Sequence, residues 1–252
     1  MSVTTVLITG AKSGIGKGLL TAYAARRNYR VIAAIRDGTA SSSAKDLQSI
    51  PTAEGSSILV VAYDASNPNS AELLTKGLET EHHIDALDVV IANAGILKHF
   101  GKAAEISAQT LTEHLEINAI APILLYKSTA SLLNKSQQTP KFFIISSVIG
   151  SNALQDTYNL PSLAYGISKA AANYAASRIH REEERIVVVP VQPGWVQTNM
   201  GNNFAAYNGL DASQVPVKLN DSVQGLIELF DAATKEKHSG LFWDYEGKQV
   251  PW

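Results

Sequence analysis

A tyrosine and a lysine four residues apart, Tyr165 and Lys169 in the run Tyr-Gly-Ile-Ser-Lys, are the pair in this chain best suited to chemistry. On a helix, side chains with this spacing lie on the same face, so the phenol and the ammonium would be neighbours. A cation stabilises a phenolate, and a phenol whose pKa is normally about 10 could then exchange a proton nearer neutrality. Such a pair suits proton transfer to or from a carbonyl oxygen. The alternative is a surface tyrosine and lysine that meet by chance.

Short apolar runs alternate with longer helical stretches and must position these groups. The expected strands are residues 3–9, 31–35, 58–63, 87–92, 142–146, 186–191 and 241–245, and the expected helices are 15–27, 71–83, 111–133, 164–181 and 222–233. Because the strands are continuous apolar runs rather than alternating ones, both faces of the sheet should be covered. The pattern predicts an α/β fold with a single doubly wound Rossmann-type domain over residues 1–252 and a mostly parallel seven-stranded sheet with helices on both faces.

We expect residues 1–135 to form a cofactor-binding half and residues 136–252 a catalytic and substrate-binding half. Residues 199–217 form the longest segment without a clear period. Segments of this kind inside compact domains are often lids or substrate loops, and otherwise ordinary surface loops.

Composition excludes several classes of protein. The formal net charge of −2 gives no excess of positive charge with which to bind nucleic acid or an anionic membrane surface. Without cysteine there is no disulfide, thiolate nucleophile or Cys-ligated zinc site, and we expect no metal site. No apolar run approaches about 20 residues, and the N-terminal run lacks the regions of a signal peptide. The expectation is a soluble cytoplasmic protein that binds neither nucleic acid nor membrane.

A glycine-rich turn follows the first expected strand and opens the first expected helix. Its residues with candidate roles in binding a dinucleotide are Gly10, Lys12, Ser13, Gly14, Ile15 and Gly16. Glycines permit a tight turn and let backbone N–H groups approach a diphosphate, while the helix N-terminus supplies a positive dipole end. The spacing Gly-x-x-x-Gly-x-Gly differs from the fingerprint Gly-x-Gly-x-x-Gly.

The end of the second strand discriminates between the two nicotinamide cofactors. Arg36 follows the strand and could grip the 2′-phosphate of NADP bidentately, with Lys12 adding a second charge. We therefore favour NADP. If Asp37 rather than Arg36 faced the ribose, NAD would be preferred.

Two further groups of residues lie at strand ends, where ligands bind in open α/β sheets. Asp64 follows the third strand, and the run Asn93, Ala94, Gly95 follows the fourth. The small side chains of Ala94 and Gly95 would let the backbone approach a ribose or an adenine. Either group could also simply end its strand, with no role in binding a ligand.

The assembled motifs resemble those of the short-chain dehydrogenase/reductase family, classical type, over essentially the whole chain. They are Thr9-Gly10-x-x-x-Gly14-Ile15-Gly16, Asn93-Ala94-Gly95, Asn118, Ser147, Tyr165-x-x-x-Lys169 and Pro193-Gly194. Further details are similar to fungal ketoreductases related to norsolorinic acid ketoreductase. They are Ile96, His180, the run from Pro193 to Gly201 and the ending Pro251-Trp252.

The resemblance implies a role for each catalytic residue. Ser147, chosen over Ser146 by its place in the Ser-Ser-x-x-Gly run, would bond the substrate carbonyl. Tyr165 would pass a proton to the developing alkoxide, and Lys169 would lower its pKa and hold the nicotinamide ribose. Asn118 would help order a water that links Lys169 to solvent.

The resemblance also extends the cofactor site beyond the sixth strand. Pro193, Gly194 and Val196 would shape the backbone beside the nicotinamide, and Thr198 would bond its carboxamide or the diphosphate. Two departures from the family stand out. Ser13 occupies a place that is basic in many NADP-preferring members, and residues 152–161 look like an insertion.

The resemblance therefore predicts an NADPH-dependent ketoreductase that reduces a ketone to a secondary alcohol. Aromatic residues beyond the strand ends would suit a hydrophobic or aromatic ketone. Candidates for that pocket wall are Leu97, Phe100, Tyr158, Trp195, Phe204 and Tyr207. We expect His99 and His180 to be structural.

Two alternative functions remain, an NAD-dependent alcohol dehydrogenase and a non-catalytic dinucleotide-binding regulator. Alanines on the helix around Tyr165 allow close packing, and the family often assembles through this helix. A homodimer or homotetramer is therefore expected.

Overall fold

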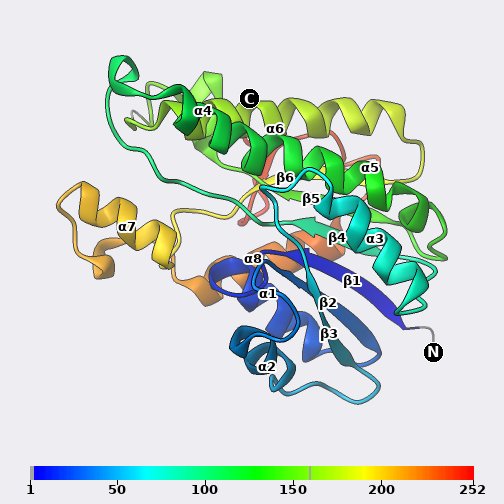
Figure 1. The fold of residues 1–252 in the computed structure, drawn as a ribbon. Coiled ribbons are helices and arrows are strands. Elements are labelled where there is room, and N and C mark those ends of the chain that lie inside the picture. The colour runs from blue at the N-terminus through cyan, green and yellow to red at the C-terminus, as the bar shows by residue number, and fades with distance from the viewer. Residues whose placement is uncertain (1–2, 159) are drawn as a thin grey trace.

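Continuous β-branched and apolar runs form a sheet that is covered on both faces. In the computed structural model, which describes residues 3–158 and 160–252, the order of the strands is β3-β2-β1-β4-β5-β6-β7, and all neighbours run parallel (Figure 1). The strands are β1 (Thr4–Thr9), β2 (Tyr29–Ile35), β3 (Ser57–Ala62), β4 (Val89–Ala92), β5 (Lys141–Ile145), β6 (Val187–Gln192) and β7 (Trp243–Asp244). The predicted fold class is confirmed.

Helices cover each face of the sheet and bury a separate core. One face carries α1 (Gly14–Ala24), α2 (Ser42–Gln48) and α8 (Leu219–Ala232), and the other carries α3 (Ser70–Thr80), α5 (Ala121–Asn134) and α6 (Leu163–Glu182). Figure 1 shows these two layers below and above the sheet. The strand order reverses between β1 and β4, so the carboxyl ends of these strands open the crevice in which this kind of sheet binds ligands.

The helix predicted at 111–133 starts earlier and is locally wider than expected. It comprises α4 (Ala108–Leu115), a π-helical turn η2 (Glu116–Ile120) and α5. The side chain of Ser107 caps its start by accepting a hydrogen bond from Thr110 N. Asn118 lies in the π turn, a distortion that is frequent at functional sites.

The segment 199–217 is not an irregular loop, and that interpretation was wrong. It begins with helix α7 (Asn199–Tyr207), which Thr198 caps by accepting a hydrogen bond from Gly201 N at 3.2 Å. A short 3₁₀ turn, η5 (Ala212–Gln214), follows. Sequence reasoning missed this helix because its sequence, Asn-Met-Gly-Asn-Asn-Phe-Ala-Ala-Tyr, has no clear hydrophobic period and is rich in Asn and Gly.

Two smaller differences concern strand length and the 152–161 segment. The strand predicted at 241–245 shrinks to β7, because the chain turns back there and Trp243 bridges Gln249. The 152–161 segment begins with the 3₁₀ turn η4 (Asn152–Leu154), and its Asn159 lies outside the described residues. Across residues 3–158 and 160–252, no helix is both long and apolar enough to cross a bilayer.

Candidate active site

Tyr165, Lys169 and Ser147 meet where the turn after β5 packs on α6. The turn η3 (Val148–Gly150) approaches α6 so closely that a Cβ on Gly150 would lie 2.6 Å from Ala170 N. This approach puts the Ser147 hydroxyl in hydrogen-bond contact with the Tyr165 phenol. Ser147 Oγ also accepts from Ile149 N at 3.3 Å, which orients it.

The neighbouring serine, Ser146, has a different environment. Its hydroxyl is buried and donates to Asn173 Oδ1, which belongs to α6. Ser146 therefore fastens β5 to α6, while Ser147 faces the tyrosine.

Burial sets the proton affinity of both α6 groups. It raises the pKa of Tyr165 to about 12, against a smaller lowering from its hydrogen bond with Ser147. It lowers the pKa of Lys169 to about 8. The expectation that Lys169 would bring the pKa of Tyr165 toward neutrality is therefore wrong for this arrangement. Removing a phenolate from water outweighs the effect of an ammonium 5.5 Å from the ring centroid.

Lys169 is held by the backbone rather than by a carboxylate. Only 4% of the residue is exposed, and Nζ donates to the carbonyl of Ile145 at 2.7 Å. A Cβ on Gly95 would lie 3.6 Å from this Nζ and 3.1 Å from Asn118 Oδ1. The end of β4 therefore lies against both side chains.

Asn118 is completely buried, and both the oxygen and the nitrogen of its side-chain amide form hydrogen bonds. Its Oδ1 accepts from Ile96 N at 2.8 Å, and its Nδ2 donates to Ile96 O at 2.9 Å and to Ser168 Oγ at 3.0 Å. Ser168 in turn donates to Tyr165 O at 2.7 Å. Asn118 thus joins the chain after β4 to the helix that carries Tyr165.

The glycine turn makes the approach that a diphosphate site requires. Gly10 and Gly14 adopt φ values of +65° and +54°, and a Cβ on Gly16 would lie 2.4 Å from Gly10 O. The side chain of Ser13 makes no capping hydrogen bond at the start of α1. The first N–H groups of that helix have no acceptor within the helix and remain available to a ligand.

Asn93 and Thr9 lock the glycine turn to the end of β4. Asn93 Nδ2 donates to Thr9 O at 2.9 Å and to Gly10 O at 3.3 Å. Thr9 Oγ1 accepts from Asn93 N and from Ala94 N, at 3.0 Å and 3.1 Å. The amide of Asn93 is therefore engaged with backbone, and Thr9 is a supporting residue to which sequence reasoning gave no role.

The loop after β6 closes the crevice opposite the glycine turn. A Cβ on Gly14 would lie 3.3 Å from Thr198 Cγ2. The glycine turn and the loop after β6 therefore contact each other at these two residues. Gly194 has a φ of +91°, and Pro193 O accepts from Ser222 Oγ at 2.6 Å. Val196 is buried and bridges Val217.

At the end of β2, Lys12 pairs with a carboxylate instead of adding a free positive charge beside Arg36, as the sequence had led us to expect. Lys12 forms an ion pair with Asp37, and its hydrogen bond, with a second one from Ser43, holds the pKa of that carboxyl below its usual range. The Lys12 ammonium is thus paired with Asp37 rather than free to face a phosphate. Arg36 is exposed and forms no hydrogen bond or ion pair with the residues that the structure describes.

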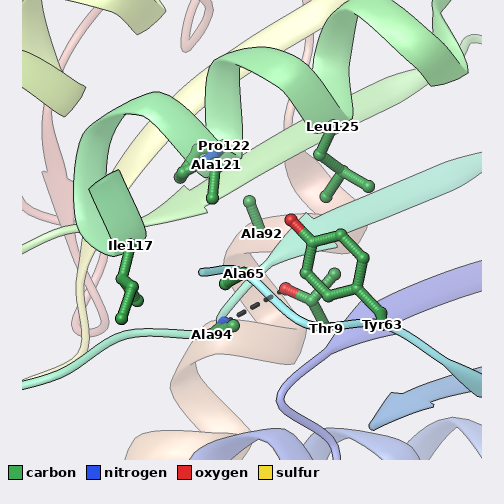
Figure 2. Close-up of a pocket in the computed structure, with 9 residues that line it drawn as sticks. All are labelled: Thr9, Tyr63, Ala65, Ala92, Ala94, Ile117, Ala121, Pro122 and Leu125. Atoms are coloured by element: carbon green, nitrogen blue, oxygen red, sulfur yellow. Dashed lines mark hydrogen bonds between the residues drawn. The ribbon is translucent and has the colours of Figure 1, made fainter. Parts of the chain in front are cut away.

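A small pocket lies at the carboxyl ends of β1, β3 and β4, next to Asp64. Figure 2 shows Ala65 and Ala94 lining it, with Ile117 of the π turn to one side. The remaining lining residues are Thr9, Tyr63, Ala92, Ala121, Pro122 and Leu125. Asp64 itself accepts from Ser66 N and Oγ through Oδ1, at 2.9 Å and 2.7 Å.

Four of the six predicted wall residues form one aromatic cluster. Phe100 contacts Phe204 and Tyr207, with ring centroids 5.1 Å and 4.7 Å apart, and Trp195 lies 5.1 Å from Phe204. Leu97 is half-buried on the same segment as Phe100. Tyr158 is exposed on the 152–161 segment, and among described residues no ring contact joins it to the cluster.

Two histidines with predicted structural roles, and one that was not considered, have different environments. His180 packs over Gly240, and its Nδ1 contacts Ser239 Oγ at 2.8 Å. His99 is half-buried, and its Nδ1 has no hydrogen-bond partner among the described residues. His114, completely buried, was missed because its helical spacing to Asn118 carries no recognised motif.

Comparison with known proteins is consistent with this geometry. The family model described as short chain dehydrogenase matches residues 4–208. The chain belongs to the short-chain dehydrogenase family. It is 36% identical to norsolorinic acid ketoreductase of Aspergillus parasiticus, covering 99% of this chain and 91% of that one. It is also 36% identical to the enzyme of the same name from Dothistroma septosporum, covering 99% and 92%. The predicted resemblance is confirmed.

Two solved structures of carbonyl reductases share this fold over essentially the whole chain. The NADPH-bound carbonyl reductase from chicken fatty liver superposes with a TM-score of 0.84 at 29% identity, covering all of both chains. The carbonyl reductase Sniffer of Drosophila melanogaster has a TM-score of 0.82 at 24% identity and supports the fold alone.

The buried ammonium predicts a pH-dependent stability. Because folding lowers the pKa of Lys169 from 10.5 to about 8, the unfolded chain binds more protons between these values, and stability rises with pH there. Relative to a Lys169→Met variant, the wild type should gain about 2 kcal/mol of unfolding free energy from about pH 7.5 to about pH 10. Urea unfolding of both proteins measures this. The exposed Lys76→Met is the control, and a pH-independent difference between wild type and Lys169→Met would contradict the assignment.

Proposed function

We propose that this short-chain dehydrogenase is an NADPH-dependent ketoreductase that reduces a ketone to a secondary alcohol. The observation that carries the proposal is the convergence of Ser147, Tyr165 and Lys169 at the carboxyl edge of the sheet. The named relatives support the reaction class, since two are norsolorinic acid ketoreductases and a structural neighbour is a carbonyl reductase.

The residues around the crevice fit a dinucleotide. Gly10, Gly14 and Gly16 let the turn pack tightly, since a Cβ at any of them would lie within 3.3 Å of another protein atom, and the N-terminus of α1 supplies donors for a diphosphate. Ser13 and Ile15 belong to the same turn, and Lys12 borders it. On the opposite wall, Pro193, Gly194, Val196 and Thr198 would line the nicotinamide end. The bound cofactor supplies a hydride, and the protein orients it.

The adenosine end would lie against β2, β3 and β4. The pocket lined by Ala65, Ala94 and Ile117 adjoins Asp64, which can reach a ribose or an adenine edge. Asn93 and Gly95 shape the backbone there. Arg36, which forms no hydrogen bond or ion pair among the described residues although it lies in the field of Asp37, would grip the 2′-phosphate.

Tyr165 would act as the proton donor in the reduction. Because burial raises its pKa to about 12, the phenol keeps its proton at neutral pH, which is the form that a donor needs. Ser147 would hydrogen-bond the same oxygen. As the C–O double bond becomes an alkoxide, the phenol O–H breaks and an alcohol O–H forms. Lys169, whose pKa of about 8 keeps it mainly protonated at neutral pH, then lies near the phenolate that results.

Proton resupply would involve Asn118 and Lys169, which both lie against Gly95. All three side-chain hydrogen bonds of Asn118 go to Ile96 and Ser168. Its role in this structure is thus to fix the backbone beside Lys169. A carbonyl in that backbone could accept a hydrogen bond from a water that leads from Lys169 to solvent.

The substrate would be a hydrophobic or aromatic ketone. Phe100, Trp195, Phe204 and Tyr207 form an aromatic wall, against which a flat ring gains contact area and stacking. Tyr158, exposed on the neighbouring segment, would contact only a substrate that reaches the surface. Residues 1–135 and 136–252 would act as one unit, the first holding the cofactor and the second supplying the catalytic groups.

Replacing Tyr165 by phenylalanine should abolish the proton donor without altering the fold. We expect kcat for NADPH-dependent reduction of an aryl ketone to fall by about 10²- to 10⁴-fold, with NADPH affinity unchanged. Steady-state absorbance and fluorescence titration measure the two quantities. Tyr126→Phe, on α5, is the matched control. Full turnover by Tyr165→Phe would refute the proposed chemistry and favour the alternative of a dinucleotide-binding regulator.

Replacing Arg36 by alanine tests the cofactor. Loss of charge-assisted hydrogen bonds to a phosphate should raise the Kd for NADPH by about 10- to 100-fold. The Kd for NADH, which lacks that phosphate, should not change. Arg30→Ala, at the opposite end of β2, controls for a general charge effect. An unchanged Kd for NADPH would show that the phosphate is held elsewhere, or that NAD is the cofactor.

A second copy of this chain is the partner that the α5–α6 side favours. Large apolar side chains remain exposed there: Ile120, Ile123, Leu163, Ile167 and Tyr174. Tyr174 is 75% exposed, and burying it against another copy would remove a large apolar surface from water. Sedimentation velocity should show a dimer or tetramer that Tyr174→Glu converts to monomers and Leu73→Glu, on α3, does not. A monomeric wild type would rule out this assembly.

A further inference from the structure

The segment of residues 96–101 connects the catalytic centre to the aromatic wall. It follows Gly95, beyond the end of β4 at Ala92, and includes Phe100, which stacks on Tyr207 of α7. None of these residues lies in a helix or a strand. The position of the segment therefore depends on the contacts that hold it.

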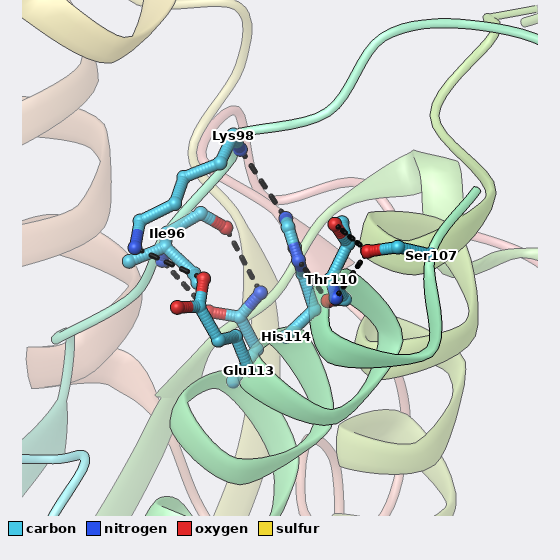
Figure 3. Close-up of polar contacts among 7 residues, drawn as sticks. Ile96, Lys98, Ser107, Thr110, Glu113 and His114 are labelled. Carbon is cyan, nitrogen blue, oxygen red and sulfur yellow. Dashed lines mark hydrogen bonds and ion pairs between the residues drawn. The ribbon is translucent and has the colours of Figure 1, made fainter. Parts of the chain in front are cut away.

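Three polar side chains of α4 and η2 fasten this segment, as Figure 3 shows for its Ile96 and Lys98. Asn118 bonds both backbone groups of Ile96. His114 Nε2 accepts from Lys98 N at 3.2 Å, and Glu113 pairs with Lys98 Nζ at 3.0 Å. At the far end, Gly101 N donates to Pro161 O at 2.8 Å.

His114 is the only one of the three that holds the backbone between Ile96 and Phe100. It is completely buried, one helical turn before Asn118. Its Nδ1 lies 2.8 Å from Thr110 O, which can only accept, so Nδ1 carries the proton. Nε2 then presents its lone pair to Lys98 N. One tautomer satisfies both contacts, and the ring joins α4 to the segment.

The ion pair between Lys98 and Glu113 is a weaker fastening. Both side chains are largely exposed, at 56% and 37%, and exposed pairs of this kind contribute little. The hydrogen bond from Lys98 N to His114 is buried by comparison, and its loss would leave a backbone donor without an acceptor.

We propose that His114 is a positioning residue that fixes the 96–101 segment as a wall of the substrate pocket and so determines affinity for ketones that extend to Phe100. The inference rests on the proposed ketoreductase function. Small ketones that occupy only the space beside Tyr165 would not contact this wall, and their affinity should not depend on it. His114 does not touch the reacting atoms, and the rate of the chemical step should not depend on it.

The experiment compares His114→Leu with His114→Gln, whose side-chain oxygen can replace the acceptor at Nε2. For naphthyl methyl ketone, His114→Leu should raise KM by about 10-fold, with kcat and the NADPH Kd unchanged. For diacetyl, KM should stay within about 2-fold of wild type. His114→Gln should restore most of the affinity for the aryl ketone. Glu113→Gln should leave both KM values near those of wild type.

Amide hydrogen exchange gives a readout that does not require activity. Peptides covering residues 96–101 should exchange faster in His114→Leu, while those of α3 should not. Leu78→Ala, a core substitution in α3, controls for lower stability and should leave exchange at 96–101 and both KM values unchanged.

The outcomes separate the two proposals. A wild type that reduces neither ketone refutes the ketoreductase function, whatever the exchange data show. The role of His114 is overturned if the wild type is active and His114→Leu has the wild-type KM for each ketone and the wild-type exchange rate at residues 96–101. An equal rise in KM for both ketones would also overturn it, since the wall would then lack selectivity.

Discussion

The burial of one ammonium group governs the arrangement of this site. Lys169 is withdrawn from water and donates to Ile145 O at the end of β5, and no carboxylate of residues 3–158 or 160–252 pairs with it. An isolated buried cation is costly, and the cost appears as a pKa lowered to about 8. Partial desolvation of the half-buried Tyr165 raises the pKa of its phenol to about 12. Solvent exclusion therefore determines the proton state of both groups.

The surrounding backbone must approach these groups closely, and small residues make this possible. Gly150 lets the turn that carries Ser147 press onto α6, and Gly95 lets the end of β4 reach Lys169. A side chain at position 150 would collide with the backbone of Ala170. The hydroxyl, phenol and ammonium are thus brought together by packing at two glycines.

The π turn places Asn118 where a regular helix would not. A π turn admits one extra residue, and it shifts the helix face at the point where Asn118 must meet Ile96 and Ser168. Its amide then ties α6 to the chain after β4. With His114 one turn earlier, the helix from α4 to α5 holds both α6 and the 96–101 segment.

The sequence by itself determined the sheet, the strand-end loops and the helical neighbours Tyr165 and Lys169, because hydrophobic periodicity, glycine spacing and helical spacing are local properties. All seven strands lie within two residues of their predicted bounds. Tertiary structure alone decided three matters: the proton affinities of Tyr165 and Lys169, the pairing of Lys12 with Asp37, and the role of His114. Each depends on burial or on contacts between segments distant in sequence, and electrostatic free energy depends on the surrounding dielectric rather than on spacing along the chain.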